Sequence, residues 1–165
     1  MPISSEDYRD ALRHFPAGVT IVTLKAKGED KPHGLTVSAF ASVSPSPPLI
    51  MVAIDHHAES YALMEQEGTV FAVNILPEDK TELSNRFAWV DDADRFDEGD
   101  WGTAVTGAPI LKDALAWLDC TIHARHDVGN NTIYVGHVQA SSVPRPDEAP
   151  LIYWNREYQK LDLGE

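Results

Sequence analysis

The sequence predicts a mainly β domain, an antiparallel barrel with a few short helices. Runs of β-branched and aromatic residues recur at strand density and follow one another without regular helical crossovers, which disfavours a doubly wound parallel sheet. Charged, glycine-containing or proline-rich segments separate these runs where turns are expected, as at 27–32 and 144–150. The 165 residues suffice for one domain with a sizeable core, so we expect residues 1–165 to form a single domain.

The first third of the chain is expected to hold one helix and three strands. Ser4, followed three residues later by Asp7, marks a helix start, and apolar residues recur at helical spacing until Pro16 ends the helix. The strands are expected at 19–24, 34–43 and 49–54. The third strand is almost wholly apolar, and we therefore expect it to be central in the sheet.

The remainder of the chain alternates between helices and strands before it ends in a hairpin and a short strand. Helices are expected at 60–67 and 78–88, and strands at 70–76, 114–126, 132–143 and 151–154. The two long strands are joined near Gly129-Asn130-Asn131, which is typical of a hairpin. The acidic segment 90–102 lacks periodicity and is interpreted as an exposed loop.

Charge and cysteine content exclude several classes of protein. The chain has 26 acidic against 13 basic residues, a formal net charge of −13, which argues against nucleic-acid binding. No apolar run is long enough to cross a bilayer, and the N-terminus does not resemble a secretory signal. Cys120 is the single cysteine, so a reducing compartment fits best and a cytoplasmic protein is expected.

No strong catalytic or metal motif is present. His56 and His57 are adjacent, and their side chains should diverge, so we expect solvated loop residues and no metal site. Cys120 lies in an apolar-rich strand without an activating neighbour and is interpreted as a buried structural thiol. The four tryptophans are interpreted as core or interface residues. We expect no catalytic side chain.

One stretch stands out because it is free of charge. Gly34 to Leu49 contains no acid, base or histidine but is rich in Ser and Thr. It is either a strand that faces solvent or a surface that offers N–H groups and hydroxyls to a planar heterocycle bearing a phosphate. An anionic ligand would need such a locally neutral site in this acidic chain.

The order of several motifs resembles the flavin reductase family, the small reductase components of two-component flavin-dependent monooxygenases. The motifs are RHFPAGVTIVT (13–23), HGLTVSAFASVSPSPPL (33–49), FAVNIL (71–76), GAPIL (107–111), LDC (118–120), IYVGHV (133–138) and PLIYW (150–154). The resemblance implies a Greek-key split β-barrel of six antiparallel strands that forms a homodimer and binds FMN or FAD. It further implies that NADH or NADPH delivers hydride to the flavin, which then leaves for a partner oxygenase.

The resemblance also implies which residues contact the ligands. Those placed around the flavin ring, ribityl chain, phosphate and tail are Thr36, Val37, Ser38, Ala39, Ser42, Val43, Ser44, Ser60, Arg86 and Phe87. Those placed near the nicotinamide nucleotide are Asn130, Asn131, Arg156 and Tyr158. The neutral strand suits the reaction because fixed N–H dipoles stabilise the negative charge that hydride transfer builds on the ring.

Departures from the family pattern leave alternative functions open. Many members carry Gly-Asp-His at the hairpin turn, where this chain has Gly129-Asn130-Asn131, and asparagine cannot carry charge. A flavin-binding electron carrier or flavin store without nicotinamide oxidase activity is therefore the second hypothesis. A scaffold or sensor that has lost flavin is the third.

Overall fold

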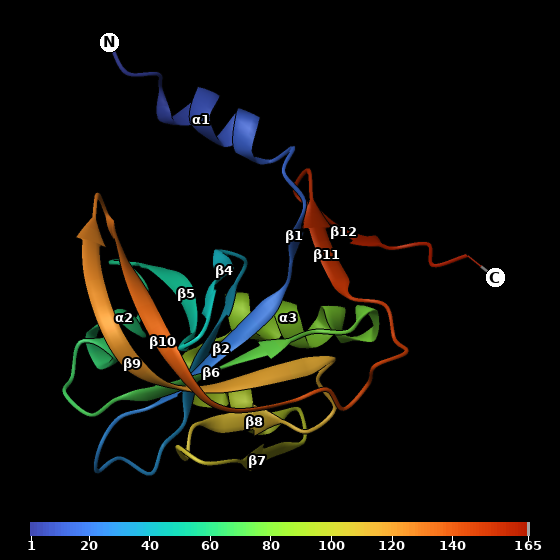
Figure 1. Ribbon diagram of the computed structural model, residues 1–165. Coiled ribbons are helices and arrows are strands. Elements are labelled where there is room, and N and C mark those ends of the chain that lie inside the picture. The colour runs from blue at the N-terminus through green and yellow to red at the C-terminus, as the bar shows by residue number, and fades with distance from the viewer. Residues whose placement is uncertain (165) are drawn as a thin grey trace.

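A seven-stranded antiparallel sheet forms the centre of the computed structural model, which describes residues 1–164 without the Asp92 side chain (Figure 1). Its strands, in spatial order, are β3 (His33–Val37), β2 (Thr20–Lys25), β6 (Val70–Ile75), β9 (Ala116–Val128), β10 (Asn131–Ser142), β5 (Pro48–Asp55) and β4 (Phe40–Pro45). Every neighbouring pair is antiparallel. The expected mainly β, antiparallel architecture is confirmed.

The expected single strand 34–43 is instead two strands. β3 and β4 lie at opposite ends of the sheet order, yet only Ser38 and Ala39 separate them. Two residues span only about 7 Å, so the two ends of the sheet must lie close together and the sheet must curl into a barrel. This division also explains why the sheet has seven strands where the family resemblance implied six.

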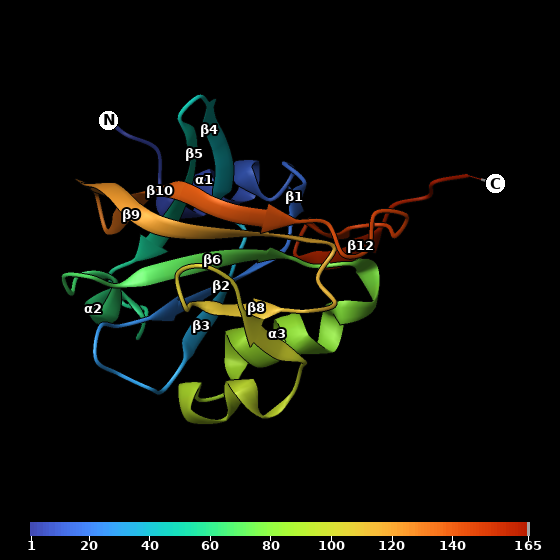
Figure 2. The same cartoon turned by 60° about the horizontal axis from the view of Figure 1, so that its bottom comes forward.

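The expectation that strand 49–54 is central is wrong, because β6 takes that place. In β5 only Ile50, Val52 and Ile54 are buried, and the residues between them are partly exposed. β6 is buried along both faces because Phe71 and Val73 contact the barrel core and Ala72 packs against the short strand β8 (Pro109–Leu111). Figure 2 shows β8 beside β6 and β2.

The helices agree with the sequence in place but are shorter than expected. They are α1 (Ser5–Leu12), α2 (Tyr61–Met64) and α3 (Thr81–Trp89), with two short 3₁₀ helices, η1 (Glu78–Lys80) and η2 (Asp92–Asp97). The predicted cap of α1 is confirmed, since the amide of Asp7 donates to Ser4 Oγ at 3.0 Å. Figure 1 shows α1 at the upper edge of the molecule, and none of its residues is buried.

The segment 90–102 is largely exposed, as its acidic composition predicted, but it is not a plain loop. It contains η2 and the start of β7 (Trp101–Thr103), which pairs with β8. Phe96 and Trp101 pack on Phe87 of α3, with ring centroids 5.0 and 5.4 Å from it. Two aromatic anchors among many carboxylates therefore hold this segment against the core.

A second, small sheet joins the two ends of the chain. β1 (Ala17–Gly18) pairs with β11 (Leu151–Trp154), which pairs with β12 (Glu157–Lys160). β11 was expected from the sequence, and β12 was not, because its alternating charged and polar residues carry a weak strand signal. The β1–β11 pairing brings the residues after α1 beside the turn between β11 and β12.

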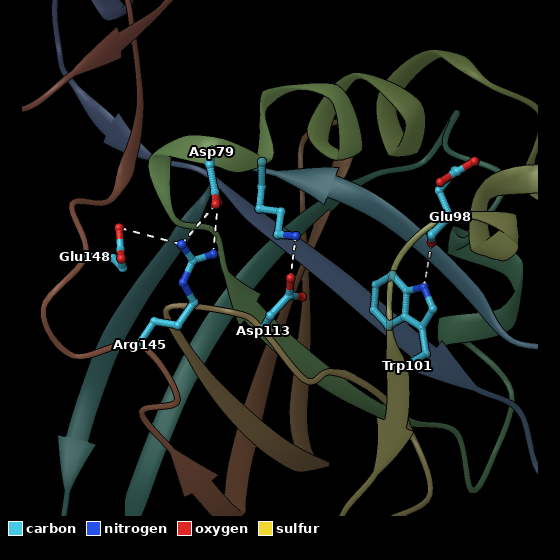
Figure 3. Close-up of polar contacts among 7 residues, drawn as sticks. Asp79, Glu98, Trp101, Asp113, Arg145 and Glu148 are labelled. Carbon is cyan, nitrogen blue, oxygen red and sulfur yellow. Dashed lines mark hydrogen bonds and ion pairs between the residues drawn. The ribbon is translucent and has the colours of Figure 1, made fainter.

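An ion pair ties the segment 144–150 to η1, the 3₁₀ turn that precedes α3 (Figure 3). Both terminal nitrogens of Arg145 donate to Asp79, at 3.0 and 2.9 Å, and Glu148 lies 3.6 Å from the same guanidinium. The hydrogen bond from Arg145 holds the pKa of the Asp79 carboxyl below its usual 3.8. A lowered pKa means that the ionised, paired form stabilises the fold above about pH 3.8 and that this contribution is lost as pH falls further.

We therefore expect Asp79→Asn to lower the free energy of unfolding at pH 7 by less than about 1 kcal/mol, because the Asp79 side chain is 56% exposed. Thermal melts of the parent and the variant between pH 7 and pH 3 measure this. The difference should shrink as the pH falls below about 3.8. A difference that stays constant over this range would show that the charge of Asp79 is not its source.

Candidate functional site

Two neighbouring cavities lie between the barrel and the small sheet. The first cavity, of about 560 Å³, is bounded by α1, the β3–β4 connection, β5 and the β11–β12 turn. The second cavity, of about 350 Å³, lies between α3, β3 and β12. Ser38, Tyr153 and Arg156 line both cavities, so the break between β3 and β4 sits where the two meet.

The lining of the first cavity is positively charged, although the whole chain has a formal net charge of −13. Its charged lining residues are Arg9, Arg13 and Arg156, without any acid among the described residues. Arg13 pairs at 2.7 Å with Asp10, which is not part of the lining. The first cavity is therefore expected to attract an anion, although the protein as a whole is acidic.

Aromatic side chains form much of the remaining wall of the first cavity. They are Tyr8, Phe15, Phe40, Tyr153 and Trp154. The indole N–H of Trp154 donates to the carbonyl of His14 at 2.9 Å, and this bond fixes the end of α1 against β11. Aromatic and apolar walls with a few cations are typical of sites for planar, charged ligands.

The turn between β11 and β12 has an unusual backbone. Asn155 and Arg156 have φ values of 53° and 66°, and Trp154 pairs with Glu157, which describes a two-residue type I′ turn. Such turns favour glycine at the second position, and an arginine there costs about 1–2 kcal/mol. Within residues 1–164 the Arg156 guanidinium makes no hydrogen bond or ion pair, so nothing in the chain itself offsets this cost.

A hydrogen-bonded group forms one wall of the second cavity. The hydroxyl of Tyr158 lies 2.8 Å from Ser84 Oγ and donates to Asn85 Oδ1 at 2.9 Å. Thr36 Oγ1 donates to the carbonyl of Ser84 at 2.6 Å. These bonds connect β3, α3 and β12. At the rim, Trp89 is 84% exposed and so is not a core residue, whereas the interface role expected as the alternative stays a prediction.

Five of the residues assigned from the family resemblance are brought together here. Ser38, Ala39 and Arg156 line the first cavity, and Thr36, Ser38, Arg156 and Tyr158 line the second. Val37 points into the barrel core and is 6% exposed, so only its backbone is near the cavities.

Three other assigned residues lie in a separate groove. Ser42, Val43 and Ser44 line a hollow of about 400 Å³ together with parts of β5, β9 and β10. Among the described residues, this groove has no charged lining side chain. The structure thus divides the neutral stretch 34–49 between the cation-lined first cavity and an uncharged groove.

The assigned residues Ser60, Arg86 and Phe87 are engaged elsewhere. Ser60 is 2% exposed at the start of α2, and Phe87 is fully buried in the aromatic cluster. The Arg86 guanidinium donates to the carbonyls of Asp94 and Arg95, at 2.6 and 3.1 Å, and so holds η2 against α3. None of the three lines either cavity.

Asn130 and Asn131 lie at the tip of the β9–β10 hairpin and line neither cavity. Asn131 Nδ2 donates to Asn130 Oδ1 at 2.8 Å, and the amide of His56 donates to the Asn130 carbonyl at 2.9 Å. His57 is exposed and hydrogen-bonded to Asp55. The roles of Asn130 and Asn131 in binding a nicotinamide nucleotide stay predictions.

The interpretation of Cys120 is confirmed, because it is fully buried and burial raises the pKa of its thiol to about 12. By contrast, sequence reasoning missed the aromatic wall and Arg9. Arg9 and Arg13 are four residues apart and so share one face of α1, but only the β1–β11 pairing turns that face toward the cavity.

Comparison with known proteins identifies the family of this chain. The family profile "Flavin reductase like domain" matches residues 12–162. The actinorhodin polyketide dimerase of Streptomyces coelicolor is 39% identical, covering 93% of this chain and 84% of that protein. "FMN reductase (NADH) RutF" of Agrobacterium fabrum is 37% identical, covering 95% and 88%.

A solved structure of a flavin oxidoreductase has the same fold as this chain. The Streptomyces globisporus NADH:FAD oxidoreductase SgcE6, in complex with NAD and FAD fragments, superposes with a TM-score of 0.86 at 29% identity, covering 99% of this chain and 98% of that one. The predicted split-barrel fold and family are thereby confirmed. This chain belongs to the flavin reductase like domain family.

Proposed function

We propose that the protein is an NAD(P)H:flavin oxidoreductase that reduces FMN or FAD and supplies the reduced flavin to a partner monooxygenase. The observation that carries this proposal is the first cavity, whose three arginines and aromatic wall meet the uncharged connection Ser38–Ala39. Family membership supports it, since relatives bear the names NADH-dependent flavin reductase and reductase subunit of a flavin-dependent monooxygenase.

The residues present fit a flavin. Arg9, Arg13 and Arg156 supply cations for a phosphate, and Tyr153 and Trp154 supply flat apolar surface for a ring system. The chemistry that a bound flavin supplies is acceptance of a hydride from reduced nicotinamide.

The chain itself binds and orients the reactants. The aromatic residues offer apolar surface to the ring, and the neutral Ser38 and Ala39 place no carboxylate where negative charge develops. Tyr158, fixed by Ser84 and Asn85, keeps the wall of the second cavity in one conformation. Hydride transfer from reduced nicotinamide to the flavin does not itself require a proton from a side chain.

The proposal is tested by mixing the purified protein with FMN or FAD and NADH or NADPH and following the absorbance of reduced nicotinamide. Flavin-dependent oxidation with at least one donor is expected. Absence of oxidation with both donors and both flavins would overturn it.

A second candidate, a flavin-binding electron carrier, is favoured only by Asn130-Asn131 at the hairpin tip, where charge for a nicotinamide nucleotide is lacking. A yellow protein that retains flavin on dialysis, and that dithionite but neither nicotinamide nucleotide reduces, would establish this candidate instead.

We also propose that the protein is a homodimer. Apolar residues of α1 and of the segment that follows it are largely exposed: Tyr8 by 55%, Leu12 by 52% and Phe15 by 75%. The same residues line the first cavity, so a second copy that covers α1 would both bury them and enclose the site.

A Leu12→Glu/Phe15→Glu double variant is therefore expected to be monomeric by light scattering and to bind FMN more weakly than the parent. Val105→Glu is the control, because Val105 is 69% exposed and lines neither cavity. A double variant that keeps the parent's mass would exclude α1 from the contact, and a monomeric parent would exclude the dimer.

Two further assignments are proposals. Residues 1–165 act as one domain, which the single barrel with its attached small sheet supports. The cytoplasm is the proposed location, and the support is Cys120, a buried and unpaired thiol suited to a reducing compartment. Among the described residues, no helix is long and apolar enough to cross a membrane.

A further inference from the structure

We propose that His123 of β9 and His137 of β10 bind one divalent transition-metal ion between them. The inference goes beyond the proposed flavin reduction and does not depend on it. The two imidazole rings lie 6.2 Å apart, centroid to centroid, on neighbouring strands. Within residues 1–164 no group of three or more His, Cys, Asp or Glu is placed to hold a metal, so this site has two protein ligands and water completes it.

The pleat of the sheet places both imidazoles on the outer face of the barrel. In β10 the buried residues Thr132 and Tyr134 alternate with residues that point outward, and His137 belongs to the outward set. His137 is opposite Thr121 of β9, and the register shift that follows leaves His123 as the extra residue of a bulge. The bulge brings His123, which is exposed, beside the half-buried His137.

The distance between the two rings suits a shared ion. An imidazole nitrogen binds Zn²⁺ at about 2.0–2.1 Å, so two rings on one ion have centroids within roughly 6.5 Å of each other. The observed separation of 6.2 Å lies inside that limit. The rings meet edge to face at 79°, and rotation of the exposed His123 side chain between its rotamers turns a nitrogen toward His137.

Both imidazoles are available to an ion. Within residues 1–164 no ring nitrogen of His123 or His137 makes a hydrogen bond or an ion pair. Other histidines have polar partners, and these are His14, His33, His56 and His57. A metal ion would supply the partner that the half-buried His137 ring lacks in the chain itself.

The surroundings indicate which metals the pair takes. Imidazole nitrogen suits Cu²⁺, Ni²⁺ and Zn²⁺, whereas Ca²⁺ and Mg²⁺ need oxygen ligands. Cys120 is fully buried, so no thiolate joins the pair. β5 and β10 carry neither Lys nor Arg, and Arg125 of β9 pairs with Glu65, so these strands place no unpaired cation beside the ion. The formal net charge of −13 also favours a cation.

The direct test is isothermal titration calorimetry of chelator-treated protein without a histidine tag. The parent should bind one Ni²⁺ per chain and should bind Cu²⁺ more tightly than Ni²⁺. Joining two ligands on one scaffold raises affinity by about 10²–10⁴-fold, so His123→Ala should weaken Ni²⁺ by about a hundredfold. Because His123 is exposed, this variant should keep the parent's melting temperature in the absence of metal.

His126→Ala is the matched control, because His126 lies on the same strand, is exposed and is opposite Ile133, away from His137. His57→Ala controls for the exposed imidazole that bonds Asp55. Both controls should retain the affinity of the parent. A parent that binds no Ni²⁺, an unchanged affinity in His123→Ala, or an equal loss in His126→Ala would overturn the site.

Electron paramagnetic resonance of bound Cu²⁺ counts the ligating nitrogens. The parent spectrum should show coupling to two imidazole nitrogens, and that of His123→Ala or His137→Ala to one. The same spectrum in the parent and both variants would overturn the pair as ligands. These measurements contain no flavin, so their outcome is independent of the reductase assay that tests the proposed function.

Discussion

Replacing Ser38 by Asp is expected to weaken FMN binding at least tenfold, or about 1.4 kcal/mol. Ser38 lines both cavities, so a carboxylate there would compete with the flavin phosphate for Arg156 and repel it. Fluorescence titration of FMN measures the effect. Ser38→Asn, which adds similar bulk without charge, is the matched control and should retain most of the affinity.

Ser44→Asp separates two placements of the phosphate. The family resemblance puts the phosphate near Ser42–Ser44, but the structure places these residues in a groove without cations. We expect Ser44→Asp to change the affinity less than Ser38→Asp does. A larger loss of FMN affinity in Ser44→Asp than in Ser38→Asp would place the phosphate along β4 and would exclude the first cavity as the phosphate site.

Gly136→Ala is expected to produce a large loss of stability. A Cβ at Gly136 would lie 2.6 Å from Phe71 Cζ and 3.1 Å from Cys120 Cβ, and both side chains are fully buried. Forcing a methyl group into a packed core costs about 1–3 kcal/mol. For a domain of this size the melting temperature should fall by roughly 2–4 °C per kcal/mol.

Gly18→Ala is the matched control for this prediction. A Cβ at Gly18 meets no atom within 4 Å, and its φ lies outside the left-handed region. Its melting temperature should stay level or rise slightly, because alanine restricts the unfolded chain. Equal melting temperatures for the two variants would show that Phe71 moves aside without cost.

Much of the barrel could be predicted from the sequence because strand patterns are local. The long strands β9 and β10 and their turn follow from β-branched density and Gly129. Composition misled at 90–102, where a high acid content concealed Phe96 and Trp101. β12 was missed because its neighbours in space, and not its own residues, make it a strand.

The candidate site could be predicted only in part. The uncharged stretch 34–49 was recognisable, since an acidic chain that binds an anion needs a region without carboxylates. The break at Ser38–Ala39 was not, because nothing in those residues forbids a continuous strand; the break follows from joining the two ends of one curled sheet.

By itself the sequence determined the positions of most strands of the large sheet, the cap of α1 and the uncharged stretch 34–49, since each depends on residues close in sequence. Only the tertiary structure decided that Arg9 and Arg13 meet Arg156, because the β1–β11 pairing joins opposite ends of the chain. It also decided that Trp89 faces solvent beside that meeting point. Contacts between distant segments depend on the packing of the whole barrel, and no local pattern encodes them.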